Sequence, residues 1–149
     1  MINHNEGWIQ PFDLKTVGKS VYEFPKSFQQ FGYYRQAAFY LLGLEKTLEK
    51  LSEQDISDYD MRLFKFIAVE NKHTSTRPAV VFNCTANDLY VGRHGGNLKG
   101  SGRRAPGYDQ LIDDLKWHRQ TNKWEMPRDL YQASGEVTLD IFKPSINFF

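Results

Sequence analysis

The pattern of apolar and polar positions changes its period along the chain, and each change predicts an element. Residues 8–17 (WIQPFDLKTV) place apolar or β-branched side chains around polar ones, which predicts a strand. Pro11 within this run indicates an edge position or a bulge, because proline cannot donate to a ladder. From Lys26 to about Leu51, apolar residues recur mostly every three, four or seven positions, which predicts a helix. Gly32 and Gly43 both weaken it, and we expect the break at Gly43, because the residues after it are far more polar.

The second half of the chain continues with shorter elements. Two apolar runs, 62–70 and 79–84, are joined by a connection of hairpin length and predict paired strands. Asn87 and Asp88 predict a turn, and residues 92–107, rich in glycine and basic side chains, predict a flexible loop. We then expect an amphipathic helix at 108–121, a short helical or loop piece at 127–133, and a last strand at 135–142. This order predicts an α/β (α+β) domain.

Composition narrows the class of protein. The 149 residues make up about one domain. Nineteen Lys and Arg face 18 Asp and Glu, so an interaction with nucleic acid would need a local basic patch rather than bulk charge. The single cysteine excludes a disulfide framework and favours a reducing, cytoplasmic environment. No apolar run approaches the ~18 residues of a membrane span, and the polar start has no signal-peptide core, so we expect no membrane partner.

The triplet Asp13-Leu14-Lys15 is the first candidate for chemistry. Residues two apart on a strand share a face, so the Asp13 carboxylate and the Lys15 ammonium can share one site. A carboxylate is a hard oxygen ligand that suits Mg²⁺, and a lysine can orient or deprotonate a water or offset charge on a phosphoryl group. Taken alone, the triplet equally describes a solvated ion pair on a surface strand.

A second group lies on the predicted helix. Gln36 and Tyr40 are four residues apart and therefore share a helix face, with Tyr33 on the same stripe and Arg35 nearby. The face offers an amide, two hydroxyls and a cation within an otherwise apolar helix. The alternative is a half-buried aromatic stripe in which Gln36 caps a backbone group.

The two groups together resemble a known family. The segments PFDLKT and FGYYRQAAFYLLG resemble the PD-(D/E)XK nuclease superfamily, in particular its RecB-like and exonuclease VIII-like branch, often carried by phages. In that branch a core strand carries (D/E)-x-K, matched here by Asp13 and Lys15, and the next helix carries Q-x-x-x-Y, matched by Gln36 and Tyr40. Residues 64–72 (FKFIAVENK) resemble the following core strand, and APGYDQLIDDLKWH resembles the C-terminal helical region. The resemblance covers most of residues 8–121.

The resemblance implies a restriction-endonuclease-like mixed sheet flanked by helices and a metal-dependent deoxyribonuclease of the exonuclease type. Asp13 would bind Mg²⁺ or Mn²⁺ together with the carbonyl of Leu14. Lys15 would position the water, and Gln36 and Tyr40 would order the site and the DNA phosphate. Hydrolysis of a phosphodiester asks mainly for hard oxygen ligands, a positioned water and charge stabilisation, so this agrees with the residues themselves. The expected setting is bacterial or phage DNA recombination.

DNA contacts are expected from the helix and from the basic loop. Glycines let backbone amides approach phosphates, and cations supply affinity that does not depend on sequence and falls with salt. The alternative is an ordinary solvated loop. The expected DNA-binding residues are Tyr33, Arg35, Arg93, Lys99, Arg103 and Arg104.

One feature departs from the family pattern. The family requires an acid on the strand before (D/E)-x-K, and the sole acid ahead of Asp13 is Glu6, in a turn-like NHNEG segment. Glu70 could add an acid if its strand runs beside that of Asp13, and His4 could stand in as a ligand. The sequence therefore predicts one nuclease-like domain over residues 1–149, truncated at its N-terminus.

Such a domain would have an open sheet edge, which we expect to pair with a second copy or a partner chain. The alternative function is a catalytically incomplete module derived from a nuclease that binds DNA or a partner protein. A third reading is a structural α/β domain whose resemblance is coincidental.

Overall fold

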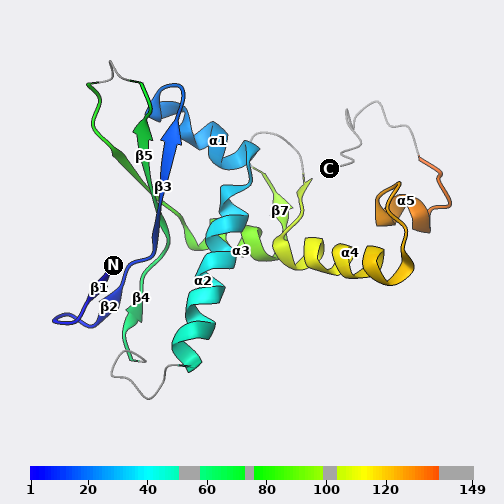
Figure 1. The fold of residues 1–149 in the computed structure, drawn as a ribbon, viewed down its shortest axis with the longest axis horizontal. Helices are drawn as coiled ribbons and strands as arrows, with labels where there is room; N and C mark the ends of the chain where they lie inside the picture. Colours follow the sequence, from blue (N-terminus) through cyan, green and yellow to red (C-terminus); the bar gives the residue numbers. More distant parts are fainter. Residues whose placement is uncertain (51–57, 73–75, 99–103, 138–149) are drawn as a thin grey trace. The chain divides into compact units, whose positions relative to one another are not determined.

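The computed structural model describes residues 1–50, 58–72, 76–98 and 104–137 (Figure 1). The chain divides into two compact units, Met1–Tyr108 and Asp109–Phe149. Among the described residues, no helix is both long and apolar enough to cross a membrane.

A parallel pair of strands lies at the centre of the first unit. Strand β3 (Phe12–Val17) runs parallel to β5 (Lys65–Glu70), and β6 (Val80–Asn83) pairs antiparallel with β5, giving the order β3-β5-β6. Figure 1 shows β3 and β5 side by side. Parallel strands need a crossover, and among the described residues a 3₁₀ helix (Val21–Glu23) and two α-helices lie between β3 and β5 in the sequence. The predicted mixed α+β class is therefore confirmed, as is the hairpin pairing of the two downstream apolar runs.

The predicted irregularity at Pro11 is a bulge. Ahead of the central pair, β2 (Trp8–Ile9) runs parallel to β4 (Asp60–Met61). From Ile9 to Phe12 the first strand advances three positions, whereas the partners Met61 to Lys65 advance four. The additional residue lies on the β4–β5 side, and Pro11 lies in the gap where no ladder donor is needed.

Buried Gln10 stabilises this bulge. Its Nε2 donates to the carbonyl oxygens of Leu63 at 2.7 Å and Pro11 at 3.0 Å. Its own backbone N–H donates to the Met1 carbonyl at 2.9 Å, and its carbonyl accepts from the Met1 amine at 3.1 Å. The short strand β1 (Ile2–Asn3) is thereby held antiparallel to β2, on the side of β2 away from β4.

The helical region breaks at Gly32, so the expected break at Gly43 is wrong. Helix α1 (Phe24–Gln30) ends just before Gly32, whose φ of +64° suits glycine, and α2 (Tyr33–Lys50) begins directly after it. Gly43 remains inside α2 with open space beside it. A helical glycine costs about 1 kcal/mol in propensity, which is too little to end a helix that packing stabilises.

The core lies between the helices and one face of the sheet. Phe24 and Phe66 are almost fully buried there and their ring centroids are 5.6 Å apart. The other sheet face carries a row formed by Leu14, Ile67 and Val81, and among these Leu14 is 59% exposed. One face is thus packed and the other is open among the described residues. The buried cluster consists of Val21, Phe24, Ala37, Phe64, Phe66, Ala68 and Cys84.

A further helix replaces the expected turn at Asn87 and Asp88. Helix α3 (Ala86–His94) begins with a capping box, because the Thr85 side chain accepts from the Asp88 backbone and the Asp88 side chain accepts from the Thr85 backbone. Gly92 lets α3 approach α2, since a Cβ there would lie 2.3 Å from the carbonyl oxygen of Tyr34.

The predicted loop at 92–107 is therefore wrong in part. Its first residues belong to α3, and two short strands follow, β7 (Gly96–Asn97) and β8 (Arg104–Ala105), which pair antiparallel.

The second unit is helical over its described part. Helix α4 (Tyr108–Thr121) begins at the boundary between the units and confirms the prediction for 108–121, and α5 (Arg128–Gln132) shows that the 127–133 piece is helical. Of the strand expected at 135–142, residues 135–137 are described and are not in a strand, and the remainder lies outside the described residues.

Candidate functional site

Asp13 and Lys15 lie on the face of β3 that is turned toward the helices. Burial alternates along β3, with Phe12, Leu14 and Thr16 exposed and the residues between them partly covered. Lys15 Nζ lies 2.7 Å from Asp13 Oδ2, and the two side chains are 18% and 26% exposed. The structure thus places both side chains on one strand face, as their spacing predicts, and the pair is more covered than an ordinary surface ion pair.

Gln36 from α2 completes a closed network with these two residues. Its Oε1 accepts from Lys15 Nζ at 2.9 Å, and its Nε2 donates to Asp13 Oδ2 at 3.2 Å. An amide is the side chain that can serve both partners, because it carries an acceptor and a donor together. We call this group the Asp13–Lys15–Gln36 network.

The aromatic ring of Tyr33 contacts the network on the side of the hydrophobic core. Lys15 Nζ lies 4.4 Å from the Tyr33 ring centroid, a distance typical of a cation–π contact. The same ring packs 5.8 Å from Phe24 and 5.8 Å from Phe66, both core residues. Tyr33 therefore anchors the ammonium to the hydrophobic core, a role that the sequence pattern did not suggest.

The local sequence explains why these side chains converge. Because the turn at Gly32 starts α2 at Tyr33, Tyr33 and Gln36 are three residues apart and lie on one face of the first helical turn. The contacts of both side chains with Lys15 show that this face is turned toward β3.

Tyr40 lies beside the network and makes none of the contacts within it that the structure gives. Its side chain is 50% exposed, and its ring centroid is 6.4 Å from that of Phe64. It follows Gln36 by one helical turn, as the Q-x-x-x-Y spacing requires, with its ring at the protein surface.

The donor atoms available to a metal are few among the described residues. Asp13 makes its ion pair and its hydrogen bond through Oδ2, and Oδ1 takes part in neither contact. The described residues contain no group of three or more His, Cys, Asp or Glu side chains placed to hold a metal. Mg²⁺ can be held by one or two carboxylates when substrate phosphate and water supply the other ligands, so the donor set fits a weak site that substrate completes.

The carbonyl of Leu14 faces the open edge of β3. The Lys65 N–H donates to the Pro11 carbonyl and the Asn71 N–H donates to the Val17 carbonyl. In a parallel pair alternate residues turn their backbone groups to opposite edges, so the odd-numbered positions bond β5. The Leu14 carbonyl therefore remains near Asp13, and the Leu14 side chain points to the other face.

Two other candidate metal ligands, Glu6 and His4, have partners away from the network. Glu6 lies in the turn of the β1–β2 hairpin, as its sequence context predicts, and its Oε2 accepts from Trp8 Nε1 at 2.5 Å. His4 Nδ1 is 2.9 Å from the Tyr59 hydroxyl in the same region. Asp13 lies five positions beyond Trp8, roughly 16 Å along an extended chain, so neither side chain reaches Asp13.

Glu70 lies on the strand next to Asp13, as expected, but it stabilises the fold. Its Oε1 accepts from the Val21 N–H at 3.0 Å and from Arg77 Nη1 at 2.7 Å, and its side chain is 5% exposed. It pairs in register with Val17, two positions beyond Lys15. The buried carboxylate thus fixes the segment that leads from β3 into α1.

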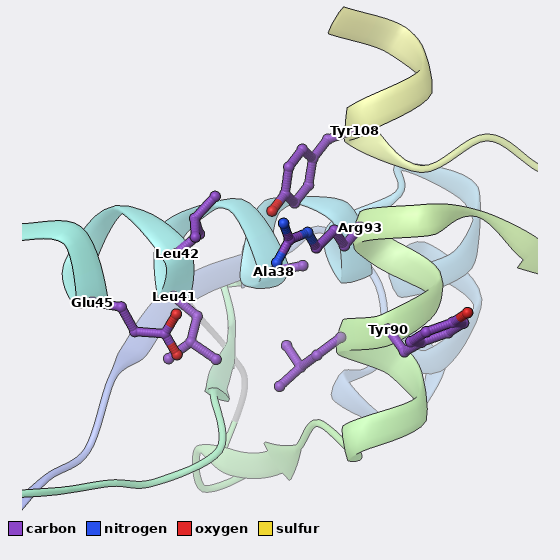
Figure 2. A pocket seen from close by; sticks show the side chains of 8 residues that line it. Ala38, Leu41, Leu42, Glu45, Tyr90, Arg93 and Tyr108 are labelled. Carbon is purple, nitrogen blue, oxygen red and sulfur yellow. The ribbon is translucent and has the colours of Figure 1, made fainter.

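Among the described basic residues expected to bind DNA, none makes one of the contacts of the network that the structure gives. Arg35 Nη1 donates to the Tyr34 hydroxyl and to the Pro106 carbonyl, each at 3.3 Å. Arg93 lines a cavity of about 190 Å³ between α2 and α3, and Figure 2 shows it beside Ala38 and Tyr108. Arg104 is exposed on β8. Lys99 and Arg103 lie outside the described residues.

Cys84 is a core residue, as predicted. It is 4% exposed within the buried cluster, and burial raises the pKa of its thiol from 9.0 to about 12. A thiol that stays protonated at neutral pH is a poor nucleophile.

No family model matches the chain, and no curated protein matches it. The functional assignment therefore depends on the residues and their geometry.

Proposed function

We propose that this chain is a metal-dependent deoxyribonuclease of the exonuclease type. The observation that carries the proposal is the Asp13–Lys15–Gln36 network, in which a carboxylate, an ammonium and an amide from β3 and α2 meet at one half-buried point. This is the combination that the PD-(D/E)XK resemblance implies for phosphodiester hydrolysis.

Each residue of the network has a distinct task in this proposal. Asp13 Oδ1 and the Leu14 carbonyl would hold Mg²⁺ or Mn²⁺, which supplies Lewis-acid stabilisation of the phosphate charge when bound. Lys15 orients the attacking water, and Tyr33 fixes the position of its ammonium. Gln36 keeps Asp13 and Lys15 in register, so that Oδ1 stays available to a ligand while Oδ2 is occupied. Tyr40 would contact the DNA backbone from the surface.

The test measures cleavage of end-labelled linear duplex and single-stranded DNA with Mg²⁺, with Mn²⁺ and with EDTA. We expect Asp13→Asn and Lys15→Met to abolish metal-dependent cleavage, and Gln36→Ala to reduce it strongly. Asp60→Asn is the matched control, because Asp60 is an exposed acid on β4, outside the network. Cleavage that survives Asp13→Asn would reject the proposal.

A second candidate function is favoured by the small number of acids. The described residues offer Asp13 as the single carboxylate of the network. A catalytically incomplete module that binds DNA or a partner protein would retain this geometry without hydrolysis. DNA affinity that falls with salt in EDTA, with no cleavage under any metal, would favour this second function.

We infer that the open edge of β3 receives a further strand. Within the described residues β3 pairs with β5 alone, and the backbone groups of Phe12, Leu14 and Thr16 face the other edge. Strand β1 runs antiparallel to β2, which leads into β3. A further strand that continued the line of β1 along the open edge would therefore run antiparallel to β3 and pass beside Asp13. Such a strand, from a second copy or a partner chain, is where a second metal-binding acid would lie.

Sedimentation velocity tests the second-copy case. We expect a concentration-dependent dimer that Thr16→Pro converts to monomer, because this proline removes an outward donor and leaves the β5 ladder intact. A monomer at all concentrations that binds no partner chain would contradict the inference.

A further inference from the structure

An exposed aromatic side chain lies next to the network without belonging to it. Phe31 is the C-cap residue that follows α1, and it is 59% exposed. Its ring centroid lies 5.8 Å from that of Tyr33, whose ring contacts Lys15 Nζ. A single side chain therefore separates the Phe31 ring from the charged centre of the candidate site.

The backbone presents this ring rigidly. The Phe31 N–H donates to the Ser27 carbonyl at 2.9 Å, and Gly32 follows with its left-handed φ of +64°. The turn is closed on its other side, because the Arg35 N–H donates to the Gly32 carbonyl at 2.9 Å. One side of the ring is supported by Tyr33 and much of the remainder faces solvent.

The positive charge of Arg35, next to the Phe31–Gly32 turn, indicates the kind of ligand that Phe31 could bind. The Arg35 guanidinium folds back over the turn, since a Cβ on Gly32 would lie 2.4 Å from its Nη2. Arg35 uses Nη1 for its two hydrogen bonds, and a guanidinium has further N–H donors. An exposed aromatic face beside a cation is the combination with which proteins bind single-stranded nucleic acid, the ring stacking on a base and the cation contacting the backbone.

We propose that Phe31 is a stacking platform for an unpaired base of single-stranded DNA, beside the Asp13–Lys15–Gln36 network. The proposal rests on the proposed function in so far as the strand bound there is the substrate. It deepens that function by naming the form of the substrate, a strand whose base next to the site is unpaired. A fully paired duplex end would have to open before its last base reaches Phe31.

The experiment measures binding of the full chain in EDTA by fluorescence anisotropy. The two probes are a labelled single-stranded oligothymidylate of twelve nucleotides and a labelled oligomer of the same length in which every nucleotide lacks its base. Phe31→Ala should weaken binding of the oligothymidylate by about fivefold to a hundredfold, and Phe31→Trp should restore it. The abasic oligomer should bind Phe31→Ala and the parent chain equally. Tyr90→Ala is the control, because Tyr90 is 62% exposed on α3 and contacts His94.

Each outcome separates this inference from the proposed function. Equal affinity of the parent chain and Phe31→Ala for oligothymidylate overturns the inference, as does an equal loss on the abasic oligomer or no binding to either oligomer. If DNA is still cleaved in those cases, the nuclease function stands without the platform. Base-dependent binding that needs Phe31, with no cleavage under any metal, supports the platform and rejects hydrolysis. A thermal melt of Phe31→Ala that matches the parent chain shows that the loss is one of contact.

Discussion

The β3–α2 region of the first unit and the α4–α5 region of the second both gather aromatic and charged side chains, but in different ways. In the first, Lys15 meets Asp13, Gln36 and Tyr33, which come from two elements far apart in sequence. In the second, the ion pairs are more exposed: Lys116 lies 3.6 Å from Asp113 with side chains 66% and 69% exposed, and Arg128 lies 3.4 Å from Asp114 with side chains 35% and 50% exposed. No described residue from 109 to 137 is buried.

The difference shows which charged groups are candidates for chemistry. An exposed pair three residues apart on a helix contributes a few tenths of a kcal/mol and is screened by salt. A partly covered pair that an amide bridges is held in one geometry, and that preorganisation is what catalysis requires. The same residue types therefore indicate a site on β3 and an ordinary solvated surface on α4.

The largest expected effect is a loss of stability when a core residue that contacts Tyr33 is truncated. Phe66→Ala should lower the free energy of unfolding by about 3–5 kcal/mol, because Phe66 is fully buried and contacts Phe24, Phe64 and Tyr33. Trp124→Ala in the second unit should change it by less than about 1 kcal/mol, because Trp124 is 54% exposed. Urea unfolding of both variants measures the contrast. Similar losses in the two would remove the distinction between the regions.

A second contrast compares two carboxylates. Glu70→Gln should destabilise the fold by about 1–3 kcal/mol, because the buried carboxylate holds Arg77 and the Val21 N–H, and Val21 is itself buried. Glu125→Gln should have no measurable effect, because Glu125 is exposed. Thermal unfolding at two salt concentrations would show this. A Glu70→Gln variant as stable as the parent chain would mean that the turn after β3 does not need its anchor.

The sequence predicted much of the site because its signals are local. Asp13 and Lys15 are two residues apart on a strand, and Gln36 and Tyr40 are four apart on a helix, so spacing places each pair on one face. The meeting of Gln36 with Asp13 and Lys15 was expected from the family resemblance. The sequence did not predict the break at Gly32, because whether a glycine breaks a helix depends on tertiary packing. Helix α3 was missed although Thr85 and Asp88 form a readable capping-box signal. The contact of Lys15 with Tyr33 and the partners of Glu70 depend on the strand crossover and could not be read from spacing.

A smaller effect is expected from pH. The folded-state pKa of Cys84 is raised to about 12 by burial, so the folded chain keeps a proton that the unfolded chain loses above its ordinary pKa of about 9. The stability is fully present below pH 9 and falls as pH rises toward 12, and the loss at pH 10 amounts to about 1–2 kcal/mol. Cys84→Ala should flatten that slope in urea unfolding between pH 8 and 10. If the dependence of the unfolding free energy on pH is the same in Cys84→Ala as in the parent chain, that dependence comes from other titrating groups.

The smallest expected effect lies in the second unit. The Tyr131 hydroxyl donates to Glu125, and this hydrogen bond lowers the pKa of the Glu125 carboxyl below its ordinary value of 4.5. The stabilisation is present above pH 4.5 and is lost as pH falls through the lowered pKa. Tyr131→Phe keeps the ring that packs 5.6 Å from Trp117 and removes the donor.

The Glu125 pKa, followed by NMR titration, should therefore rise in the Tyr131→Phe variant. The free energy of unfolding at pH 7 should stay unchanged within error, because both side chains are at the surface and screened by solvent. A loss at pH 7 comparable to that of Glu70→Gln would show that the helical unit, like β3 and α2, depends on a fixed polar network. The distinction between a fixed polar network in the β3–α2 region and solvated surface contacts in the α4–α5 region would then no longer hold.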